Sequence, residues 1–145
     1  MFRAAVLLAL VLGASGVSAA EYASVGKAGA VLFDAPSANA TPLFVAPQGM
    51  PIELLSVIRV WVKARDAAGD VFWIERSDIA PGRTVVTTAQ AVVRAFANEA
   101  AEVMFTADRG VLLELLEVDP APGWSRVRHR DGTAGFVRHT QIWGL

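Results

Sequence analysis

The chain has 145 residues, no cysteine, and 13 basic against 14 acidic side chains, which leaves a formal net charge of −1. A chain without cysteine has no disulfide and no lipid anchor on cysteine, so its stability must come from packing alone. The slightly acidic balance argues against a nucleic-acid partner, because proteins that bind nucleic acid usually present a clearly basic face.

The first twenty residues have the pattern of a secretory signal peptide. Arg3 precedes an apolar run over residues 4–12, and small residues at 13–20 supply the positions that a signal peptidase reads. We expect cleavage after Ala20 or Ala19, and hence a periplasmic or secreted protein. An uncleaved membrane anchor is the alternative, although nine apolar residues are too few to span a bilayer. No second long apolar run follows, so we expect a soluble mature protein without a membrane span.

The rest of the chain contains an internal repeat. A shift of 61 residues sets 23–57 against 84–118 without a gap, and twelve of the 35 aligned pairs are identical. Beyond a two-residue insertion within 119–123 the shift becomes 63, which pairs Trp61 with Trp124. We therefore predict two modules, module 1 at residues 21–81 and module 2 at residues 82–145, joined at a Pro-Gly turn.

Signals for β-strands dominate both modules. Residues 84–88 are rich in β-branched side chains, and residues 124–130 alternate with period two. The pair Asp131-Gly132 then predicts a hairpin that leads into residues 135–137. Residues 89–105, taken alone, have the spacing of an amphipathic helix. The aligned stretch 33–42 contains two prolines, which break helix interiors, so we predict a strand start and a long loop in both modules.

These segments resemble the bacterial SH3 family (SH3b, Src-homology-3-like). Residues 123–128, the turn at 131–132 and residues 135–137 are similar to the closing pattern of that family, and residues 142–144 resemble the tail of a subgroup in secreted bacterial proteins. The resemblance covers essentially the whole mature chain as a tandem pair. It implies an all-β fold of two small SH3-like barrels, and a binding or targeting role in the cell envelope.

Side chains that carry catalysis are sparse. The chain has no cysteine nucleophile, no Gly-x-Ser-x-Gly elbow around any serine, and no metal-binding spacing around His129 or His139. A metal pair of the two histidines is conceivable if the hairpin brings them together, but exposed histidines beside arginines are the simpler interpretation. We therefore predict that the protein is not an enzyme and needs no cofactor or metal.

Aromatic residues are the better candidates for a site. Counting by two from the inward-facing Ala64 and Val127 places two tryptophans and the basic residues that follow them on the outer face of the barrels: Trp61, Lys63, Arg65, Trp124, Arg126 and Arg128. Exposed rings beside cations suit a Pro-rich, sugar or acidic peptide ligand. The alternative is that both tryptophans pack beneath the long loop or between the modules. Trp143 is expected to cap the barrel or the contact between modules.

Two functions from different classes remain open. The first is a non-catalytic cell-envelope binding module that recognises peptidoglycan or a peptide segment of a periplasmic partner. The second is a structural or assembly partner of another periplasmic protein, without a small ligand. Exposure of Trp61 and Trp124 along a groove would favour the first function, and burial of both between the modules would favour the second.

Overall fold

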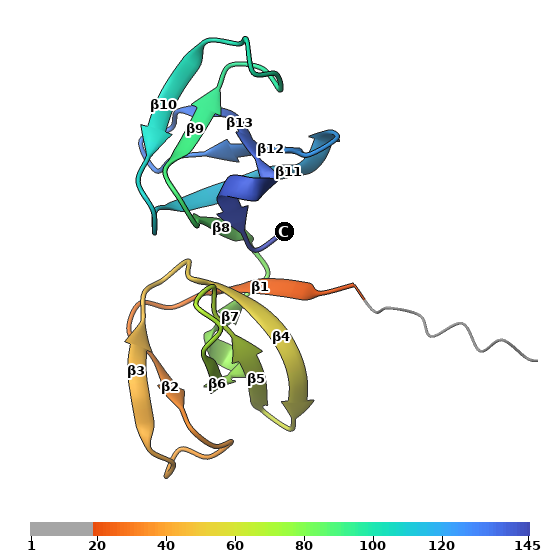
Figure 1. Ribbon diagram of the computed structural model, residues 1–145. Coiled ribbons are helices and arrows are strands. Elements are labelled where there is room, and N and C mark those ends of the chain that lie inside the picture. The colour runs from red at the N-terminus through yellow and green to blue at the C-terminus, as the bar shows by residue number, and fades with distance from the viewer. Residues whose placement is uncertain (1–18) are drawn as a thin grey trace, which may run out of the picture.

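The computed structural model describes residues 19–145, so the expected signal sequence falls, but for its last two residues, outside the described residues. The described chain forms two seven-stranded antiparallel sheets, one in each module, and the modules are stacked end to end (Figure 1). The prediction of an all-β tandem pair is therefore confirmed. None of the helical segments within residues 19–145 is long and apolar enough to cross a membrane.

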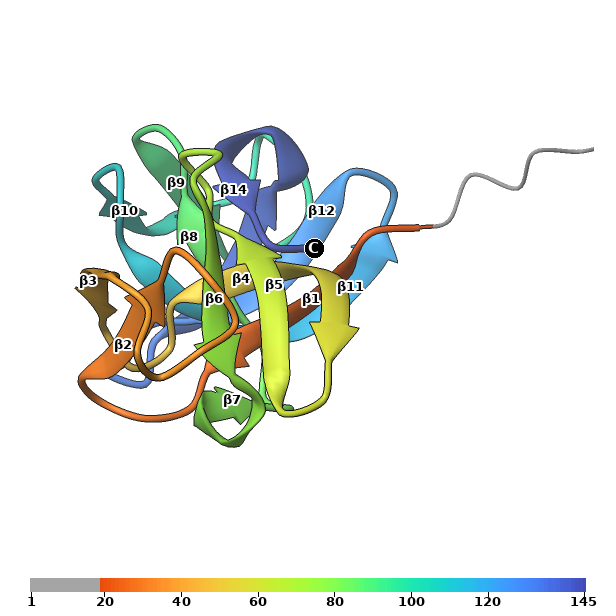
Figure 2. The same ribbon diagram turned by 90° about the horizontal axis from the view of Figure 1, so that it is seen from below.

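Module 1 contains seven strands in the spatial order β3-β2-β6-β5-β4-β1-β7. They are β1 (Glu21–Val25), β2 (Ala30–Phe33), β3 (Pro42–Ala46), β4 (Pro51–Ile58), β5 (Trp61–Arg65), β6 (Val71–Glu75) and β7 (Ile79–Ala80). A single 3₁₀ turn, η1 (Arg76–Asp78), lies between the last two strands. Seen from below, the strands curl around one another in front of module 2 (Figure 2).

Module 2 repeats this topology in the order β10-β9-β13-β12-β11-β8-β14. Its strands are β8 (Thr84–Thr87), β9 (Ala91–Arg94), β10 (Val103–Ala107), β11 (Leu112–Ala121), β12 (Trp124–Arg128), β13 (Ala134–Arg138) and β14 (Ile142–Trp143). The turn η2 (His139–Gln141) corresponds to η1. The predicted hairpin joins β12 to β13, with Arg128 opposite Ala134.

The strand registers confirm most of the repeat and correct its beginning. Ala30 pairs with Ala46 as Ala91 pairs with Ala107, which is the predicted shift of 61 residues. In the first strands, however, Ala23 pairs with Ile52 and Val85 pairs with Leu113. The shift there is 62, so the gapless alignment of residues 23–29 was wrong. The connection from β8 to β9 is one residue shorter than that from β1 to β2.

The helix-like segment 89–105 is a strand followed by a loop, as the comparison of the two copies predicts. β9 ends at Arg94, residues 95–102 form the long loop, and β10 begins at Val103. The loop closes on itself, because the Ala95 N–H donates to the Glu102 carbonyl at 2.8 Å. In module 1 the Asp34 N–H donates to the Thr41 carbonyl at 3.1 Å. Both long loops therefore have the same backbone arrangement, despite the difference in helix propensity.

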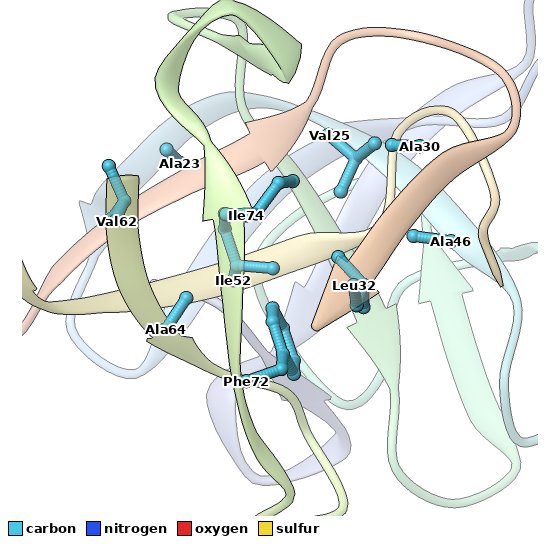
Figure 3. Close-up of a cluster of buried hydrophobic side chains, with 10 residues drawn as sticks. All are labelled: Ala23, Val25, Ala30, Leu32, Ala46, Ile52, Val62, Ala64, Phe72 and Ile74. Atoms are coloured by element: carbon cyan, nitrogen blue, oxygen red, sulfur yellow. The ribbon is translucent and has the colours of Figure 1, made fainter. Parts of the chain in front are cut away.

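Alternating side chains fill a separate core in each module. In module 1 the buried cluster includes Leu32, Ile52, Phe72 and Ile74, whose side chains point toward one another in Figure 3. Module 2 buries Val85, Val93, Leu113, Val127 and Val137 in the same way. Two cores of this size are individually marginal, so contacts between the modules contribute to the stability of both.

The junction between the modules is built from the first and last strands. The Thr84 N–H donates to Ser24 Oγ at 3.0 Å, and the Thr84 hydroxyl donates to the Gly49 carbonyl. The rings of Tyr22 and Trp143 meet edge to face with centroids 5.1 Å apart, which confirms that Trp143 caps the contact between the modules. The C-terminus accordingly lies beside β1 in Figure 1.

Candidate binding surfaces

The two predicted anchor tryptophans are buried. Trp61 is 9% exposed and Trp124 is 5% exposed, so the prediction that both rings stand free on the outer face was wrong. Counting by two gave the correct side of the strand, since Val62 and Ala64 do point into the core. The outer face is covered at these positions by parts of the chain that the alternation of a single strand does not reveal.

Different side chains contact the two tryptophans. The ring of Phe33, at the end of β2, packs edge to face on Trp61 with centroids 5.5 Å apart. The guanidinium of Arg138, at the end of β13, lies 4.6 Å from the ring centroid of Trp124. Each ring is therefore buried within its own module, beside the start of the long loop in module 1. Neither ring lies between the modules.

The predicted basic residues are mostly engaged by neighbours. Arg65 pairs with Glu53 at 2.5 Å, and Arg128 pairs with Glu114 at 2.7 Å at the equivalent place in module 2. Lys63 is half-buried, with its ammonium 6.0 Å from the ring centroid of Trp73. Arg126 is exposed and takes no part in the ion pairs found among the described residues. The six predicted residues therefore do not form one surface.

A cleft between the modules brings charged, polar and apolar side chains together on one surface. It has a volume of about 550 Å³, and we call it the inter-module cleft. It is lined by Gln48, Gly49, Thr84, Val111, Leu112, Leu113, Glu114, Arg128, His129 and Arg130. A second hollow of about 410 Å³ shares Gln48, Gly49, Thr84 and Glu114 and continues toward the linker. Clefts between domains are common places for ligands, because two surfaces can contact one molecule.

One wall of the inter-module cleft carries charge and hydrogen-bonding groups. Arg128 and Glu114 form a two-pronged ion pair, with Nε and Nη2 of the arginine donating to the carboxylate at 2.7–3.0 Å. Arg130 is exposed and has no ion-pair partner among residues 19–145. The lining also includes the apolar residues Val111 and Leu112 of the same module. This combination suits an extended chain with both apolar and anionic or carbonyl groups.

The turn from 129 to 133 holds the charged wall in place. The His129 N–H donates to the Thr133 carbonyl at 2.9 Å, and the Thr133 N–H donates to the Asp131 carboxylate at 2.8 Å. This bond to the Thr133 backbone lowers the pKa of Asp131 below its ordinary value, helped by the Thr133 hydroxyl and by His129. The Asp131 carboxylate therefore stays charged to lower pH than usual, and it lies 3.4 Å from His129 Nδ1.

A Ser–His–Asp grouping in module 2 does not have the geometry of a hydrolase. Ser125 Oγ lies 2.9 Å from His139 Nε2, and the same nitrogen is 3.9 Å from the Asp119 carboxylate. Ser125 is fully buried, however, and its hydroxyl donates to the Val118 carbonyl. A nucleophile must be accessible and must give its proton to the base, and this serine does neither. The grouping instead fastens the β11–β12 hairpin to η2.

Of the cleft residues, the predicted ligand-binding set contained only Arg128, and His129 was considered only as half of a conceivable metal pair. The signal that could have added Arg130 was the basic alternation of residues 126–130, which is exposed as predicted. Gln48 and Gly49 carried no signal of a site, because these residues of module 1 come close to Arg130 only when the two modules dock. No group of three or more potential metal ligands occurs in the part of the chain that the structure describes.

Comparison with known proteins gives a family. The family model described as the bacterial SH3 domain matches twice, at residues 26–81 and 87–144. No curated protein matches the chain. Its structure is similar to two solved structures from Trichomonas vaginalis, NlpC2 (9% identity, TM-score 0.40) and NlpC1 (11%, 0.39), and to an NlpC/P60 family protein from Bacillus cereus (15%, 0.38).

These matches cover 86%, 94% and 85% of this chain and 48%, 50% and 56% of the three structures, so the chain spans about half of their length. The two family matches together cover most of residues 19–145, and each lies within one of the two sheets. The chain therefore belongs to the bacterial SH3 domain family, whose members are generally binding modules, and carries two copies of that domain.

Proposed function

We propose that the protein is a non-catalytic binding module of the cell envelope, which holds a peptide segment in the inter-module cleft. The segment belongs to peptidoglycan or to a periplasmic protein partner. The observation that supports this proposal best is the cleft itself, about 550 Å³, whose lining combines Gln48 and Gly49 of module 1 with Arg130 and Leu112 of module 2. A single SH3-like barrel would not bring these residues of both modules together.

The side chains of the cleft match the groups of a peptide. An extended peptide offers carbonyl oxygens, amide N–H groups and, at acidic residues or its end, carboxylates. Arg130 can donate to carboxylates, and the exposed Gln48 and half-buried His129 can exchange hydrogen bonds with the peptide backbone. Val111 and Leu112 add apolar contact area that favours burial of small aliphatic side chains.

The envelope location rests on the N-terminal sequence. Arg3, the apolar run and the small residues before Glu21 have the pattern of an export signal. Export would bring the cleft into the compartment where peptidoglycan peptides and envelope proteins are accessible. A mature start at Ala20 or Glu21, measured by mass spectrometry of protein from cells, supports this part of the proposal. An intact Met1 in the membrane fraction would contradict it.

A second candidate function is assembly with a partner protein without a small ligand. The observation that favours it is a set of exposed apolar side chains on the edge strand β3, namely Leu43, Phe44 and Val45, at 44%, 40% and 62% exposure. Adjacent exposed apolar residues of this kind mark protein contacts more often than small-molecule sites. In this function the cleft would be a consequence of docking and would bind nothing.

One experiment separates the two functions. The mature protein is incubated with purified sacculi and sedimented, and in parallel it is crosslinked in periplasmic extract. Cosedimentation that is competed by a soluble peptidoglycan peptide supports the cleft proposal with a peptidoglycan ligand. Crosslinking to one protein without cosedimentation supports a protein partner, and the crosslinked residues then distinguish the cleft from β3. The absence of both signals would rule out both functions.

A further inference from the structure

Two arginines converge on one carboxylate at the free end of module 2, and we call Arg94 and Arg138 the arginine clamp. Arg138 Nε lies 2.5 Å from Glu99 Oε1, and Arg94 Nη2 lies 3.6 Å from Glu99 Oε2. Glu99 belongs to the long loop that joins β9 to β10, at the top of Figure 1 and away from module 1. The clamp is therefore separate from the inter-module cleft.

Groups other than Glu99 hold both arginines in position. The guanidinium of Arg138 lies over the buried ring of Trp124, and Arg94 Nη1 donates to the Ala101 carbonyl at 2.9 Å. Their side chains are only 41% and 19% exposed, whereas the side chain of Glu99 is 60% exposed. Loss of Glu99 would consequently leave two oriented guanidinium groups facing solvent, which is the arrangement that recognises a carboxylate.

Module 1 shows that the fold does not require this cluster. Its long loop has the same backbone hydrogen bonds, but Phe33, Ala38 and Glu75 occupy the positions of Arg94, Glu99 and Arg138. Phe33 covers Trp61 without any ion pair. The arginine clamp is therefore a property of module 2 alone, and burial of the tryptophan does not explain the two cations.

The balance of charge in the clamp favours an additional anion. Two guanidinium groups share a single carboxylate, so one positive charge remains uncompensated among the contacts of the described residues. Phe96, three residues before Glu99 in the same loop, is 68% exposed, whereas module 1 has alanine at the matching position 35. A cationic pair and an exposed aromatic ring at one end of a module suit a peptide that ends in, or contains, a carboxylate.

We propose that Arg94 and Arg138 form a carboxylate-binding site for a peptide, and that Glu99 occupies this site in the free protein as an internal competitor. The ligand carboxylate replaces that of Glu99, which moves into solvent with its loop. Ion pairs as exposed as this one are weak, so the competitor reduces affinity without closing the site. This site goes beyond the proposed function, because it lies outside the inter-module cleft and recognises a different part of the partner.

The test measures binding of acetyl-Ala-Ala with a free carboxylate, and of its C-terminal amide, by NMR of the arginine Nε–H and tryptophan indole groups. The carboxylate probe should shift the Arg94, Arg138 and Trp124 signals, and the amide should not. Glu99→Gln should bind the carboxylate probe about fivefold more tightly than the parent protein. A competing ion pair as exposed as that of Glu99 can lower the affinity of the site by about this factor. Arg138→Gln should lose the binding.

Glu102→Gln is the matched control, because it removes the same charge from the same loop. Glu102 takes part in none of the ion pairs among residues 19–145, so this variant should bind like the parent protein. If Arg138→Gln fails to fold, Arg94→Gln replaces it, since Arg94 does not cover Trp124. The proposal would be overturned if Glu99→Gln and Glu102→Gln bound the carboxylate probe with equal affinity. It would also be overturned if the amide probe bound as tightly as the carboxylate probe.

The outcome is independent of the inter-module cleft. Arg130→Ala, which alters the cleft, should leave the shifts at Trp124 and Arg138 unchanged. A protein that binds the carboxylate probe at the clamp but ignores sacculi and peptides at the cleft would support this inference while refuting the proposed function. A protein that binds sacculi or peptides at the cleft but not the carboxylate probe at the clamp would support the proposed function while refuting this inference.

Discussion

Tyr22 in the first strand lies edge to face against Trp143 in the last, with ring centroids 5.1 Å apart. This contact joins β1 of module 1 to β14 of module 2 and packs one module against the other. The hydrogen bonds of Thr84 to Ser24 and Gly49 lie in the same junction. The width of the inter-module cleft therefore depends in part on Tyr22, Ser24 and Trp143, which do not line it.

The junction can be observed directly through Tyr22, because it is the single tyrosine of the chain. Burial raises the pKa of its phenol above the ordinary value of 10.0, and the nearby Glu53 carboxylate raises it further. The folded state thus favours the neutral phenol. Its contribution to stability is complete below the ordinary pKa and is lost as the pH rises through the raised value. Phenolate absorbance during an alkaline titration should show a midpoint above 10.0.

Trp143→Ala should move that midpoint back toward the ordinary pKa, because removal of the indole exposes the phenol to water. The variant keeps the Glu53 contribution, so the return should be partial. Trp73→Ala, which removes an equal ring outside the junction, is the control and should leave the Tyr22 titration unchanged. An unchanged midpoint in Trp143→Ala would mean that the two rings do not meet in solution.

Thr84→Val should loosen the junction at nearly constant volume. Thr84 donates its hydroxyl to the Gly49 carbonyl, so the hydroxyl of Ser24, 2.9 Å away, is left to donate to Thr84 Oγ1. Valine removes this acceptor, so the O–H of Ser24, which is 3% exposed, has no acceptor, although Ser24 Oγ still accepts from the Thr84 N–H. The expected loss is about 1–3 kcal/mol in the free energy of unfolding, measured with urea. Thr140→Val, at an exposed position, should change stability little.

Trp61→Ala and Trp124→Ala should each destabilise their own module strongly. Both rings are buried, and truncation of a buried tryptophan or phenylalanine costs about 3–5 kcal/mol. Calorimetry should therefore show a lowered melting temperature for either variant, before any effect on binding is considered. Variants that keep the parental melting temperature would show that these rings are exposed in solution after all.

Gly135→Ala should disturb the packing of module 2 at a defined contact. A Cβ atom at this position would lie 2.6 Å from Val93 Cγ1 and 2.7 Å from the Arg94 carbonyl oxygen, too close for either. Module 1 has Phe72 at the matching position, so the two cores have different shapes. Gly132→Ala is the comparison, because its φ of 95° costs strain while its Cβ meets nothing. Thermal melts should show a larger loss of stability for Gly135→Ala than for Gly132→Ala. The loss at Gly135 should lie well above the ~1 kcal/mol expected at Gly132.

The sequence predicted the fold well because the signals for it are local or repeated. The alternation at 124–128 and the two prolines in 33–42 led to the correct strands and loops, even where residues 89–105 looked helical. The prediction of exposed tryptophans failed because alternation tells which side of a strand a ring occupies and nothing about what covers that side. Phe33 and Arg138 reach Trp61 and Trp124 through the tertiary fold.

The inter-module cleft could not be predicted for a related reason. Gln48 and Arg130 are 82 positions apart, and the repeat gives no information on how one copy docks on the other. The gapless start of the alignment hid the one-residue difference between the β1–β2 and β8–β9 connections. That difference lies directly after Val25 in module 1 and after Thr87 in module 2.

Whether the inter-module cleft is the binding site is tested most directly by comparing Arg130→Ala with Arg126→Ala. Both variants are measured in cosedimentation with purified sacculi and in binding of the peptide that the crosslinking identifies. Both arginines are exposed and belong to one basic run, and each variant removes one positive charge, but only Arg130 lines the inter-module cleft. Our account predicts that Arg130→Ala weakens binding about tenfold or more, as loss of a charge-assisted hydrogen bond does, while Arg126→Ala binds like the parent protein. Equal losses in the two variants would show that binding follows net charge alone, and that the cleft is not the binding site.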